Sequence, residues 1–335
     1  MRYRLEFRRY LLPLRAAVRT AHGVWAQREG LLVRLAGEDG AVGFGEAAVI
    51  PWFGSETADE AEAACRELGE QVDDARLDSI PARWRCLRNA LGAARQPQTL
   101  AIASGKSLGV AALLPAGRMV LAAITPRAEM GFRVFKWKVG AGDLADELAL
   151  LDDVCAALPN GSKLRLDANG AWNRRQAERW LERCADRPVE FVEQPVAADA
   201  PGAADLLLGL ANDFPTALAL DESLSTEDDV ERWLGAGWRG GFVVKPSLLG
   251  DVAGAVEKLA RAKANVVFSS ALETAVGAQA ALRVAFGWTG ESRALGFGVW
   301  PLFADARFDG PVMAPFVRWE DVERIDPEVV WNALN

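Results

Sequence analysis

The stretch Phe135-Lys136-Trp137-Lys138-Val139-Gly140 places two lysines in alternation within a run of β-type residues. Successive side chains of a strand point to opposite faces, so Lys136 and Lys138 share one face. Lysine is scarce in this chain, since seven of its 38 basic residues are lysines and the rest are arginines. A buried lysine can lose its proton and act as a base, whereas arginine stays protonated. The pair is therefore a candidate for chemistry, although an isolated Lys-x-Lys is more often two solvated charges.

Apolar runs of strand length recur on both sides of this stretch and alternate with helical patterns. We expect strands in the eight runs 108–114, 132–139, 164–169, 190–194, 217–222, 241–245, 266–270 and 294–299. Helical patterns lie between most of them, for example over 142–158, 174–185, 227–234 and 251–262. Consecutive strand–helix units give parallel strands. Eight runs at this spacing predict an α/β fold that closes into a (β/α) barrel over residues 107–300.

The first hundred residues are organised differently. Alternating side chains predict strands over 2–10, 30–36 and 41–48, which we expect to form an antiparallel sheet. A loop is expected over 19–25, and helical patterns run over 55–72 and 81–94. Residues 1–106 are therefore predicted to form an α+β domain, and residues 301–335 are expected to pack back on it.

Composition and charge restrict the classes of function. The chain has 335 residues, of which 50% are hydrophobic and 25% charged, as in a globular protein. Its net charge of −8 argues against a nucleic-acid or membrane-surface partner. The four cysteines have no CxxC spacing, and no segment is apolar enough for a signal peptide or a membrane span. We expect a cytoplasmic protein, a monomer or homo-oligomer, that acts on a small-molecule carboxylate.

Acidic residues fall at the ends of three consecutive predicted barrel strands. They are Asp167 in LRLDANG, Glu193 in FVEQP and Asp221 in LALDES. Barrel active sites lie at the carboxyl ends of the strands, so these carboxylates are expected at one rim. Three carboxylates repel one another unless a cation joins them, and hard oxygen ligands suit Mg²⁺. The alternative for each acid alone is the N-cap of the following helix.

Lys245 ends the next predicted strand, in Gly-Phe-Val-Val-Lys-Pro. The barrel would place Lys138 and Lys245 on opposite sides of the carboxylates, because one strand precedes the acidic strands and the other follows them. A metal between two lysines is suited to the removal of a proton next to a substrate carboxylate, since one lysine can take that proton. Nearby cations and partial burial are expected to lower the pKa of the basic lysine.

Further candidates lie in the first domain and at the last two strands. Ser269 and Ser270 follow a strand and precede a helix, where hydroxyls bind an anion or only cap the helix. Gly296 leaves room for a ligand to approach the last strand. His22 is the single histidine of the chain, and its loop position fits either a substrate contact or a local hydrogen bond.

These motifs resemble the muconate-lactonising-enzyme subgroup of the enolase superfamily over essentially the whole chain. The matching residues are KWK at 136–138, Asp167-Ala168-Asn169, Glu193-Gln194-Pro195, Asp221-Glu222 and Lys245-Pro246. Further matches are TAHGVWAQREG at 20–30, GFGEAA at 43–48, PWFG at 51–54 and FSSALET at 268–274. The resemblance implies a modified, (β/α)7β barrel with an N-terminal α+β capping domain.

The resemblance also implies roles for individual residues. Mg²⁺ would be held by Asp167, Glu193 and Asp221. Lys138 would be the base, Lys245 the stabilising charge on the opposite face, and Lys136 a neighbour that helps to lower the pKa of Lys138. The implied substrate-binding residues are Ser269, Ser270, Asn169, Trp25, Arg28, Trp52 and Gly296. The loops at 20–28 and 52–54 are expected to close over the site.

The implied reaction is the Mg²⁺-dependent dehydration of 2-succinyl-6-hydroxy-2,4-cyclohexadiene-1-carboxylate, which makes its ring aromatic during menaquinone or phylloquinone synthesis. One alternative is racemisation of an N-succinylamino acid, or epimerisation of a dipeptide, by the same lysines. The last strand, Gly296-Phe297-Gly298, lacks the Asp-x-Asp with which dipeptide epimerases of the subgroup hold a substrate ammonium. The second alternative is a non-catalytic barrel that binds a carboxylate.

Overall fold

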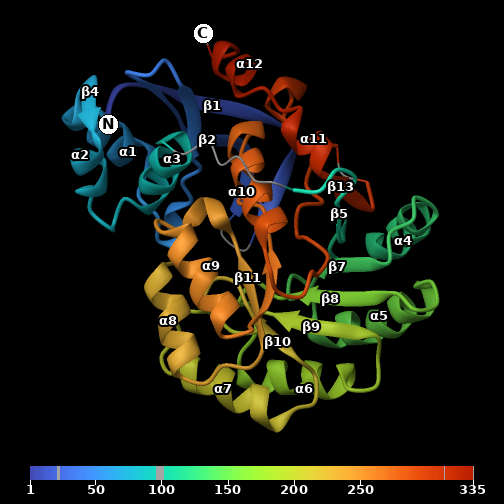
Figure 1. Cartoon of the computed structure of the whole chain (residues 1–335). Helices are drawn as coiled ribbons and strands as arrows, with labels where there is room; N and C mark the ends of the chain where they lie inside the picture. Colours follow the sequence, from blue (N-terminus) through green and yellow to red (C-terminus); the bar gives the residue numbers. More distant parts are fainter. Residues whose placement is uncertain (21–22, 96–101, 313, 335) are drawn as a thin grey trace.

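The computed structural model describes residues 1–20, 23–95, 102–312 and 314–334. Two large sheets organise it (Figure 1). An antiparallel sheet with three helices forms the part that we call the cap, and a parallel sheet curls into a barrel below it in this view. The predicted fold class, an α/β barrel with an N-terminal α+β cap, is confirmed.

The cap sheet has four antiparallel strands in the order β3-β2-β1-β4. The strands are β1 Arg2–Thr20, β2 Gly23–Gly37, β3 Val42–Ala47 and β4 Gln71–Asp73, and the helices are α1 Ala58–Leu68, α2 Asp74–Asp78 and α3 Arg85–Arg95. Helix α3 lies very close to β3, because a Cβ at Gly43 or Gly45 would collide with the carbonyl oxygens of Ala94 or Ala90. These two glycines therefore set the distance between helix and sheet. The 3-10 turn η1, Pro51–Phe53, follows β3.

The hairpin of β1 and β2 is longer than the sequence predicted. The loop expected over 19–25 is wrong in extent, because the two strands stay paired up to Thr20 and Gly23. The strand alternation continues beyond residue 10, and a register shift between Pro13 and Val18 absorbs the irregularity at the proline. Near the far end of the hairpin, Val18 and Trp25 pack against the barrel core.

The C-terminal segment contacts both parts of the molecule. The Pro13 carbonyl accepts a hydrogen bond from the Ala304 N–H (2.9 Å), so the irregular part of β1 is paired with this segment. Trp331 packs against Phe44 of the cap with ring centroids 6.0 Å apart, whereas Trp319 packs against Phe286 of the barrel at 5.3 Å. The elements here are η3 Ala306–Phe308, β13 Phe316–Arg318, α11 Trp319–Glu323 and α12 Pro327–Asn332. The exact boundary at residue 106 stays a prediction.

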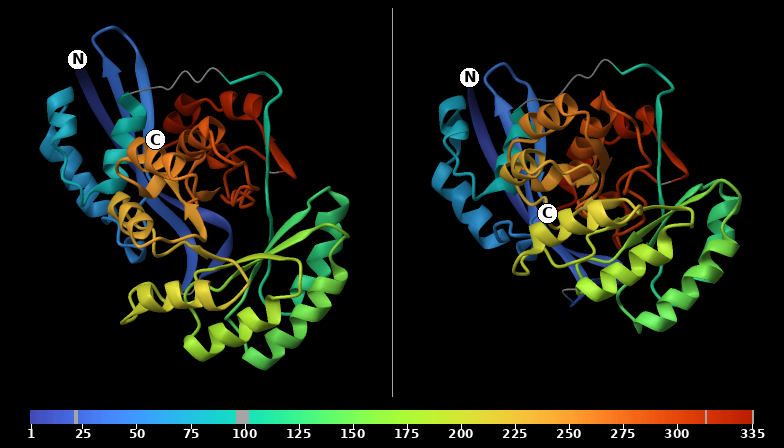
Figure 2. Two further views of the ribbon diagram at one scale, coloured as in Figure 1. Left: turned by 60° about the horizontal axis from the view of Figure 1, so that its bottom comes forward. Right: turned by 90° about the horizontal axis from the view of Figure 1, so that it is seen from below.

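Seven parallel strands form the barrel sheet, in the order β12-β11-β10-β9-β8-β7-β6. They are β6 Ala112–Leu114, β7 Val134–Lys138, β8 Lys163–Asp167, β9 Val189–Glu193, β10 Leu218–Leu220, β11 Gly241–Val244 and β12 Asn265–Phe268. The helices are α4 Met119–Glu129, α5 Leu144–Ala157, α6 Arg174–Cys184, α7 Ala203–Asp213, α8 Glu227–Gly235, α9 Val252–Arg261 and α10 Ala275–Gly287. Figure 2 shows α4 to α9 outside the strands. Capping boxes begin α6 and α8, at Asn173 and Thr226.

The barrel closes through the last predicted strand, which is reduced to two bridging residues. Leu295 bridges Val110, and Gly296 bridges Ser269, both in parallel orientation. A Cβ at Gly296 would collide with the Ser269 hydroxyl, and one at Gly298 would lie 2.5 Å from the Ala111 carbonyl oxygen. The glycines are therefore required for this close approach of backbones.

The first predicted barrel strand, 108–114, is divided in two. Its beginning forms β5, Ser107–Gly109, which pairs antiparallel with β13. Only its end, β6, pairs with β7. The division arises at Val110, whose N–H donates to the Pro315 carbonyl, while the next N–H donates to Leu295 and closes the barrel.

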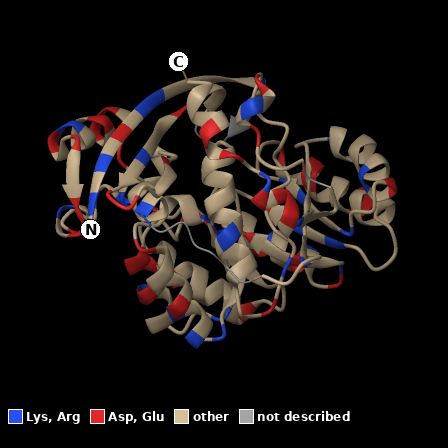
Figure 3. Ribbon diagram, turned by 45° about the horizontal axis from the view of Figure 1, so that its top comes forward, with Lys and Arg blue, Asp and Glu red and all other residues tan. Residues whose placement is uncertain are grey.

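The cores of cap and barrel are distinct but share a boundary. The cap core contains two barrel residues, Leu248 in the 3-10 turn η2 (Pro246–Leu248) and Ala271 after β12. Acidic and basic residues are interspersed over both parts (Figure 3). Within the described residues, no helix is long and apolar enough to cross a membrane.

Candidate active site

A cavity of about 160 Å³ lies at the carboxyl ends of the barrel strands, under the cap hairpin. Its barrel wall contains most of the residues singled out in the sequence: Lys136, Lys138, Asp167, Asn169, Asp221, Lys245, Ser269, Ser270 and Gly296. The cap contributes Val18, Trp25, Ile50, Trp52 and Phe53. The structure therefore brings the predicted barrel residues, except Glu193, and two of the predicted cap residues around one space. Glu193 lies behind the wall and contacts Lys136.

The alternation of β7 places its two lysines on the barrel interior. Phe135 and Trp137, between and beside them, are fully buried, and Trp137 packs edge-on against Trp180 of α6 with centroids 6.2 Å apart. The apolar side chains thus face the surrounding helices while Lys136 and Lys138 face inward. Lys138 is the more accessible of the two, with 32% of its side chain exposed against 14% for Lys136.

The predicted metal-binding carboxylates end three neighbouring strands. Asp167 ends β8, Glu193 ends β9 and Asp221 follows β10, and each is at least 96% buried. The register aligns them, since Lys138 is paired with Asp167, and Asp167 with Glu193. The strands pair in regular register at their carboxyl ends. This register explains why the spacing of the three acids along the sequence predicted that they lie close together.

The lysines bind these carboxylates directly. Lys136 Nζ lies 2.9 Å from Asp167 Oδ2 and 2.7 Å from Glu193 Oε1. Lys138 Nζ lies 3.0 Å from Asp167 Oδ2 and donates to Asn169 Oδ1 at 2.6 Å. Lys245, on the far side of the barrel, binds Asp221. Lys138 and Lys245 therefore lie on opposite sides of the carboxylates, as the strand order predicted.

Electrostatics distinguish the central groups. Burial alone would lower the pKa of Lys136, but the charges of Asp167 and Glu193 outweigh it and hold that pKa above its ordinary value. Burial opposes ionisation of Asp167, yet Lys136 and Lys138 together keep its pKa below the ordinary range. Burial and the charge of Asp167 raise the pKa of Glu193. Lys136 is thus bound as a cation between two carboxylates.

Two further polar residues complete the site and were not assigned roles from the sequence. The Gln194 side-chain oxygen accepts the N–H groups of Asp221 (3.0 Å) and Ser223 (3.1 Å), which fixes the loop after β10. Glu222 Oε1 accepts from Asn169 Nδ2 at 3.0 Å, whereas its Oε2 is buried without a partner. The Glu-Gln-Pro and Asp-Glu pairs were visible in the sequence, but only the fold shows that Gln194 holds the loop after β10 and that Glu222 lines the cavity.

The donor set is that of a site for a hard cation. Four buried or nearly buried carboxylates, of Asp167, Glu193, Asp221 and Glu222, gather here, and burial together with the neighbouring negative charges raises the pKa of Glu193 and Glu222. A divalent cation relieves such repulsion and can use an unpartnered oxygen such as Glu222 Oε2. As the side chains stand, with lysines between the acids, the described residues contain no group of three ready metal ligands. The residues fit Mg²⁺ in chemistry, and a metal would compete with Lys136 and Lys245 for their carboxylates.

Ser269 and Ser270 line the cavity, but both hydroxyl groups have partners in the protein. Ser269 Oγ donates to the Gly296 carbonyl at 3.2 Å. Ser270 Oγ donates to Glu273 Oε2 at 3.1 Å and accepts the Leu272 N–H at 2.9 Å. The serines shape the wall of the cavity through these bonds. Their binding of a substrate anion stays a prediction.

The cap residues predicted to bind substrate divide into two groups. Trp25 and Trp52 meet edge-to-face at the cavity mouth, with centroids 4.2 Å apart, and Phe53 lies over Lys245 Nζ at 4.5 Å. Arg28 is 2% exposed, and its guanidinium is turned to backbone carbonyls instead of the cavity. His22 lies outside the described residues.

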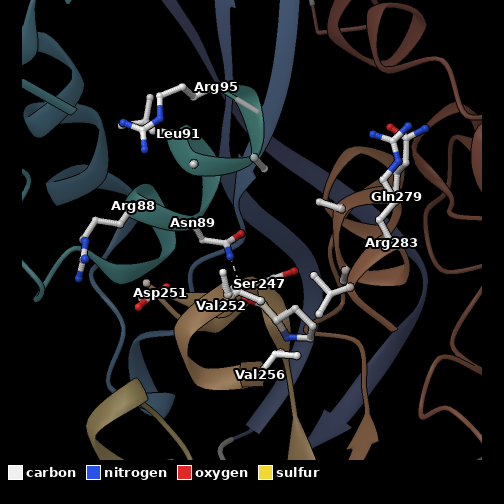
Figure 4. A pocket seen from close by; sticks show the side chains of 18 of the residues that line it. Arg88, Asn89, Leu91, Arg95, Ser247, Asp251, Val252, Val256, Gln279 and Arg283 are labelled. Carbon is white, nitrogen blue, oxygen red and sulfur yellow. Dashed lines mark hydrogen bonds between the residues drawn. The ribbon is translucent and has the colours of Figure 1, made fainter. Parts of the chain in front are cut away.

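A larger cavity, of about 630 Å³, lies between α3 and the helices α9 and α10 (Figure 4). The lysines and carboxylates described above do not line it. Arg88 in its wall is paired with Glu227 at 3.2 Å. Asn89 donates to the carbonyls of Pro246 (3.0 Å) and Leu249 (3.1 Å). We therefore place the chemistry in the smaller cavity.

Glu273 is a fully buried carboxyl directly behind the serines. Its Oε2 accepts from Ser270 and from the Ala271 N–H at 2.5 Å, while Oε1 has no partner. Burial raises the pKa of Glu273 to about 7, and the charge of Glu46 contributes to the shift. The carboxyl therefore titrates near neutrality.

Replacement of this group is expected to change how stability depends on pH. Between about pH 4.3 and 7, the folded state keeps the Glu273 proton longer than the unfolded state does, so wild-type stability falls as pH rises. Glu273→Gln lacks this contribution. Its free energy of unfolding, relative to that of wild type, should therefore rise through that window by at most about 1.4 kcal/mol per pH unit. Urea unfolding of both proteins across this pH range measures the difference. Glu231→Gln, at a 68% exposed side chain, is the control, and parallel curves for wild type and Glu273→Gln would contradict the assignment.

Comparison with known proteins supports the reading of the fold and the motifs. The family model "Enolase C-terminal domain-like" matches residues 119–315, and "MenC, N-terminal domain" matches residues 2–83. The chain is 37% identical to the o-succinylbenzoate synthase of Thermosynechococcus vestitus, over 96% of this chain and 99% of that protein. It is 31% identical to the o-succinylbenzoate synthase of Yersinia enterocolitica, over 83% and 84% of the two chains.

Solved structures agree with these matches. The o-succinylbenzoate synthase of Thermosynechococcus elongatus, complexed with Mg in the active site, superposes with a TM-score of 0.82 at 34% identity, covering 98% of this chain and 99% of that one. The L-Ala-D/L-Glu epimerase of Bacillus subtilis also gives 0.82, at 21% identity and covering 94% and 95% of the chains, which shows the shared fold. The chain therefore belongs to the o-succinylbenzoate synthase family of the enolase superfamily.

Proposed function

We propose that this enzyme dehydrates 2-succinyl-6-hydroxy-2,4-cyclohexadiene-1-carboxylate to 2-succinylbenzoate, as an Mg²⁺-dependent o-succinylbenzoate synthase. The product would serve menaquinone or phylloquinone synthesis. The observation that carries the proposal is the placement of Lys138 and Lys245 on opposite sides of three buried carboxylates, in a chain of this family. The anionic substrate would lie between the amino groups of the two lysines.

Asp167, Glu193 and Asp221 are the residues that we assign to Mg²⁺. Their carboxylates are hard oxygen ligands at the ends of adjacent strands, and a close relative was solved with Mg in its active site. When bound, Mg²⁺ would supply Lewis-acid stabilisation of the negative charge that develops on the substrate carboxylate.

We assign the proton transfer to Lys138. Its Nζ takes the proton from the ring carbon that bears the carboxylate, and the electrons of that C–H bond form the new ring double bond. Nζ then returns the proton to the departing hydroxyl, so that the C–O bond breaks, water leaves and the ring becomes aromatic. Asn169, which accepts from Nζ at 2.6 Å, orients the amine.

Lys245 and the cap support this step. Lys245 places a positive charge on the opposite side of the ring, and the Phe53 ring, 4.5 Å from its Nζ, holds it there. Trp25 and Trp52 cover the mouth of the cavity. Exclusion of water by these rings strengthens the charge interactions inside.

The test is an absorbance assay of ring aromatisation, with Mg²⁺ and with EDTA. We expect turnover that requires the metal and is lost with the chelator. N-succinylamino acids incubated in D₂O provide the comparison, because exchange of their α-proton without dehydration of the cyclohexadiene would identify a racemase instead. Absence of both activities in folded protein that binds Mg²⁺ would favour a non-catalytic, carboxylate-binding barrel.

A further inference from the structure

Two buried charged side chains of the cap sheet reach across to one segment of the barrel. Arg28 on β2 and Glu46 on β3 are each 2% exposed. Neither side chain is among the described residues that line the active-site cavity. Both contact the stretch from Ala271 to Gly277, which connects β12 to the first turn of α10. The roles assigned so far leave these two residues without a function.

Arg28 binds the beginning of that stretch through its carbonyl groups. Its Nε donates to the Leu272 carbonyl at 3.1 Å, and Nη2 donates to the Ala271 carbonyl at 3.3 Å. Nη1 donates to the Val49 carbonyl of the cap at 2.8 Å. Leu272 has a φ of 59°, a left-handed conformation that a residue with a branched side chain rarely adopts. The planar guanidinium thus joins cap backbone to barrel backbone where the barrel backbone is strained.

Glu46 binds the end of the same stretch through its amide groups. Its carboxylate accepts from the Thr274 N–H at 2.9 Å, from the Gly277 N–H at 2.9 Å and from the Thr274 hydroxyl. The Tyr10 hydroxyl donates to Glu46 Oε1 at 2.6 Å from the cap side. These amides form the N-terminus of α10, where the helix dipole favours a negative charge. Glu46 is therefore an anionic cap for a barrel helix, supplied by the other part of the molecule.

Two glycines leave space for this contact. A Cβ at Gly277 would lie 2.9 Å from Glu46 Oε2 and 2.8 Å from the Glu273 Cβ. A Cβ at Gly30 would collide with the Tyr10 hydroxyl that holds the carboxylate. The close approach of carboxylate to helix end therefore depends on backbone positions without side chains.

The opposite side of the same segment is the wall of the active site. Ser269, Ser270, Ala271 and Leu272 line the cavity. Glu273, next in sequence, holds the Ser270 hydroxyl, and the charge of Glu46 acts on Glu273. A shift of the cap relative to α10 is thus transmitted to residues that face the substrate.

We propose that Arg28 and Glu46 are positioning residues, which bind the two ends of the 271–277 segment and thereby fix the active-site wall relative to the cap. One consequence is that Arg28 acts through the backbone of the wall without touching substrate. The expected effect of these residues on substrate affinity rests on the proposed dehydratase function. Their expected effect on the order of the 271–277 segment does not.

Gly277→Ala tests the proposal with every polar group retained. The added methyl should displace the Glu46 carboxylate and also press on Glu273 Cβ, which would lie 2.8 Å away. A misplacement of about 1 Å near a reacting centre costs on the order of 10²-fold in kcat/KM. We expect KM for the cyclohexadiene substrate to rise about tenfold or more. Gly209→Ala, in α7 with nothing within 4 Å of its Cβ, is the matched control and should keep the wild-type KM.

Substitutions of Arg28 and Glu46 themselves provide a second test. Arg28→Lys keeps the charge but loses the planar fork, and Glu46→Gln keeps the shape but loses the charge on the helix end. Both should raise KM. The matched controls Arg34→Lys and Glu29→Gln lie on β2 but bind partners within the cap, and should not. KM is the decisive quantity, because a variant that merely unfolds in part lowers the maximal rate and leaves KM unchanged. Wild-type KM in the folded fraction of the three site variants would overturn the role in catalysis.

Amide hydrogen exchange tests the segment without any substrate. In the Glu46→Gln and Gly277→Ala proteins, exchange in a peptide that spans 271–277 should become at least tenfold faster than in their controls, with α5 and α6 unchanged. Unchanged exchange in this peptide would refute the positioning role even if the protein proved to have another activity. A wild type with no dehydration activity but with this exchange pattern would refute the proposed function and retain the contact between cap and wall.

Discussion

Lys138→Ala should lower kcat for aromatisation by about 10²- to 10⁴-fold, the range that one positioned acid–base group contributes. The side chain is the most exposed of the three lysines in the site and is directed to the cavity, so substrate can reach its Nζ. Removal of the amine leaves the carboxylates in place. The rise in melting temperature on addition of Mg²⁺ should therefore be preserved. Steady-state kinetics and thermal unfolding of the same preparation measure both quantities.

Lys163→Ala is the matched control for this substitution. Lys163 starts β8 at the opposite end of the barrel and is exposed, so its loss removes a lysine and a charge without touching the site. It should retain wild-type kcat. If Lys138→Ala retained full Mg²⁺-dependent activity, the base would have to be sought elsewhere, with Lys245 the first choice because it approaches from the other face.

Glu193→Gln should lower kcat/KM by about 10³-fold or more, because Lewis-acid stabilisation is worth several kcal/mol and each 1.36 kcal/mol is tenfold in rate. Glutamine keeps the size of the side chain and can still accept the hydrogen bond of Lys136, which is 2.7 Å from Glu193 Oε1. It removes one negative charge from the proposed metal site. The stabilisation that Mg²⁺ gives to wild type by binding to the folded state should therefore be lost in this variant.

The variant also separates loss of metal from loss of fold. Burial and the charge of Asp167 disfavour the ionised form of Glu193, so the neutral glutamine should leave the protein without metal at least as stable as wild type. Glu231→Gln, at an exposed side chain paired with Lys258, is the control and should keep the full response to Mg²⁺. An unchanged Mg²⁺-induced shift in the Glu193→Gln protein would contradict the ligand assignment.

The sequence predicted the centre of the site because parallel strands repeat a simple rule. Each strand end delivers a residue to the same rim, so the regular separations of Asp167, Glu193, Asp221 and Lys245 were enough to infer their proximity. The period of two in β7 likewise placed both lysines inward. The backbone register of the strands decides where these side chains lie, and the register follows from the local sequence pattern of each strand.

The surroundings of the site could not be inferred in this way. The barrel partners of Arg28 and Glu46 lie more than 220 residues away in the chain, and neither periodicity nor spacing carries information over that range. The extent of the β1–β2 hairpin was missed because Pro13 interrupts the alternation, while pairing with the C-terminal segment compensates for it. The sequence left Ser269 and Ser270 as either anion-binding or helix-capping hydroxyls, and only the fold shows that Gly296 and Glu273 accept from them.

The makeup of the cap core constrains the order in which the protein can mature. The ribosome delivers the strands of the cap sheet first, yet their core includes Leu248 and Ala271, and Trp331 covers Phe44 at the other end of the chain. The part synthesised first is therefore completed last. Nascent chains that end before the barrel is finished should therefore expose an unpacked cap.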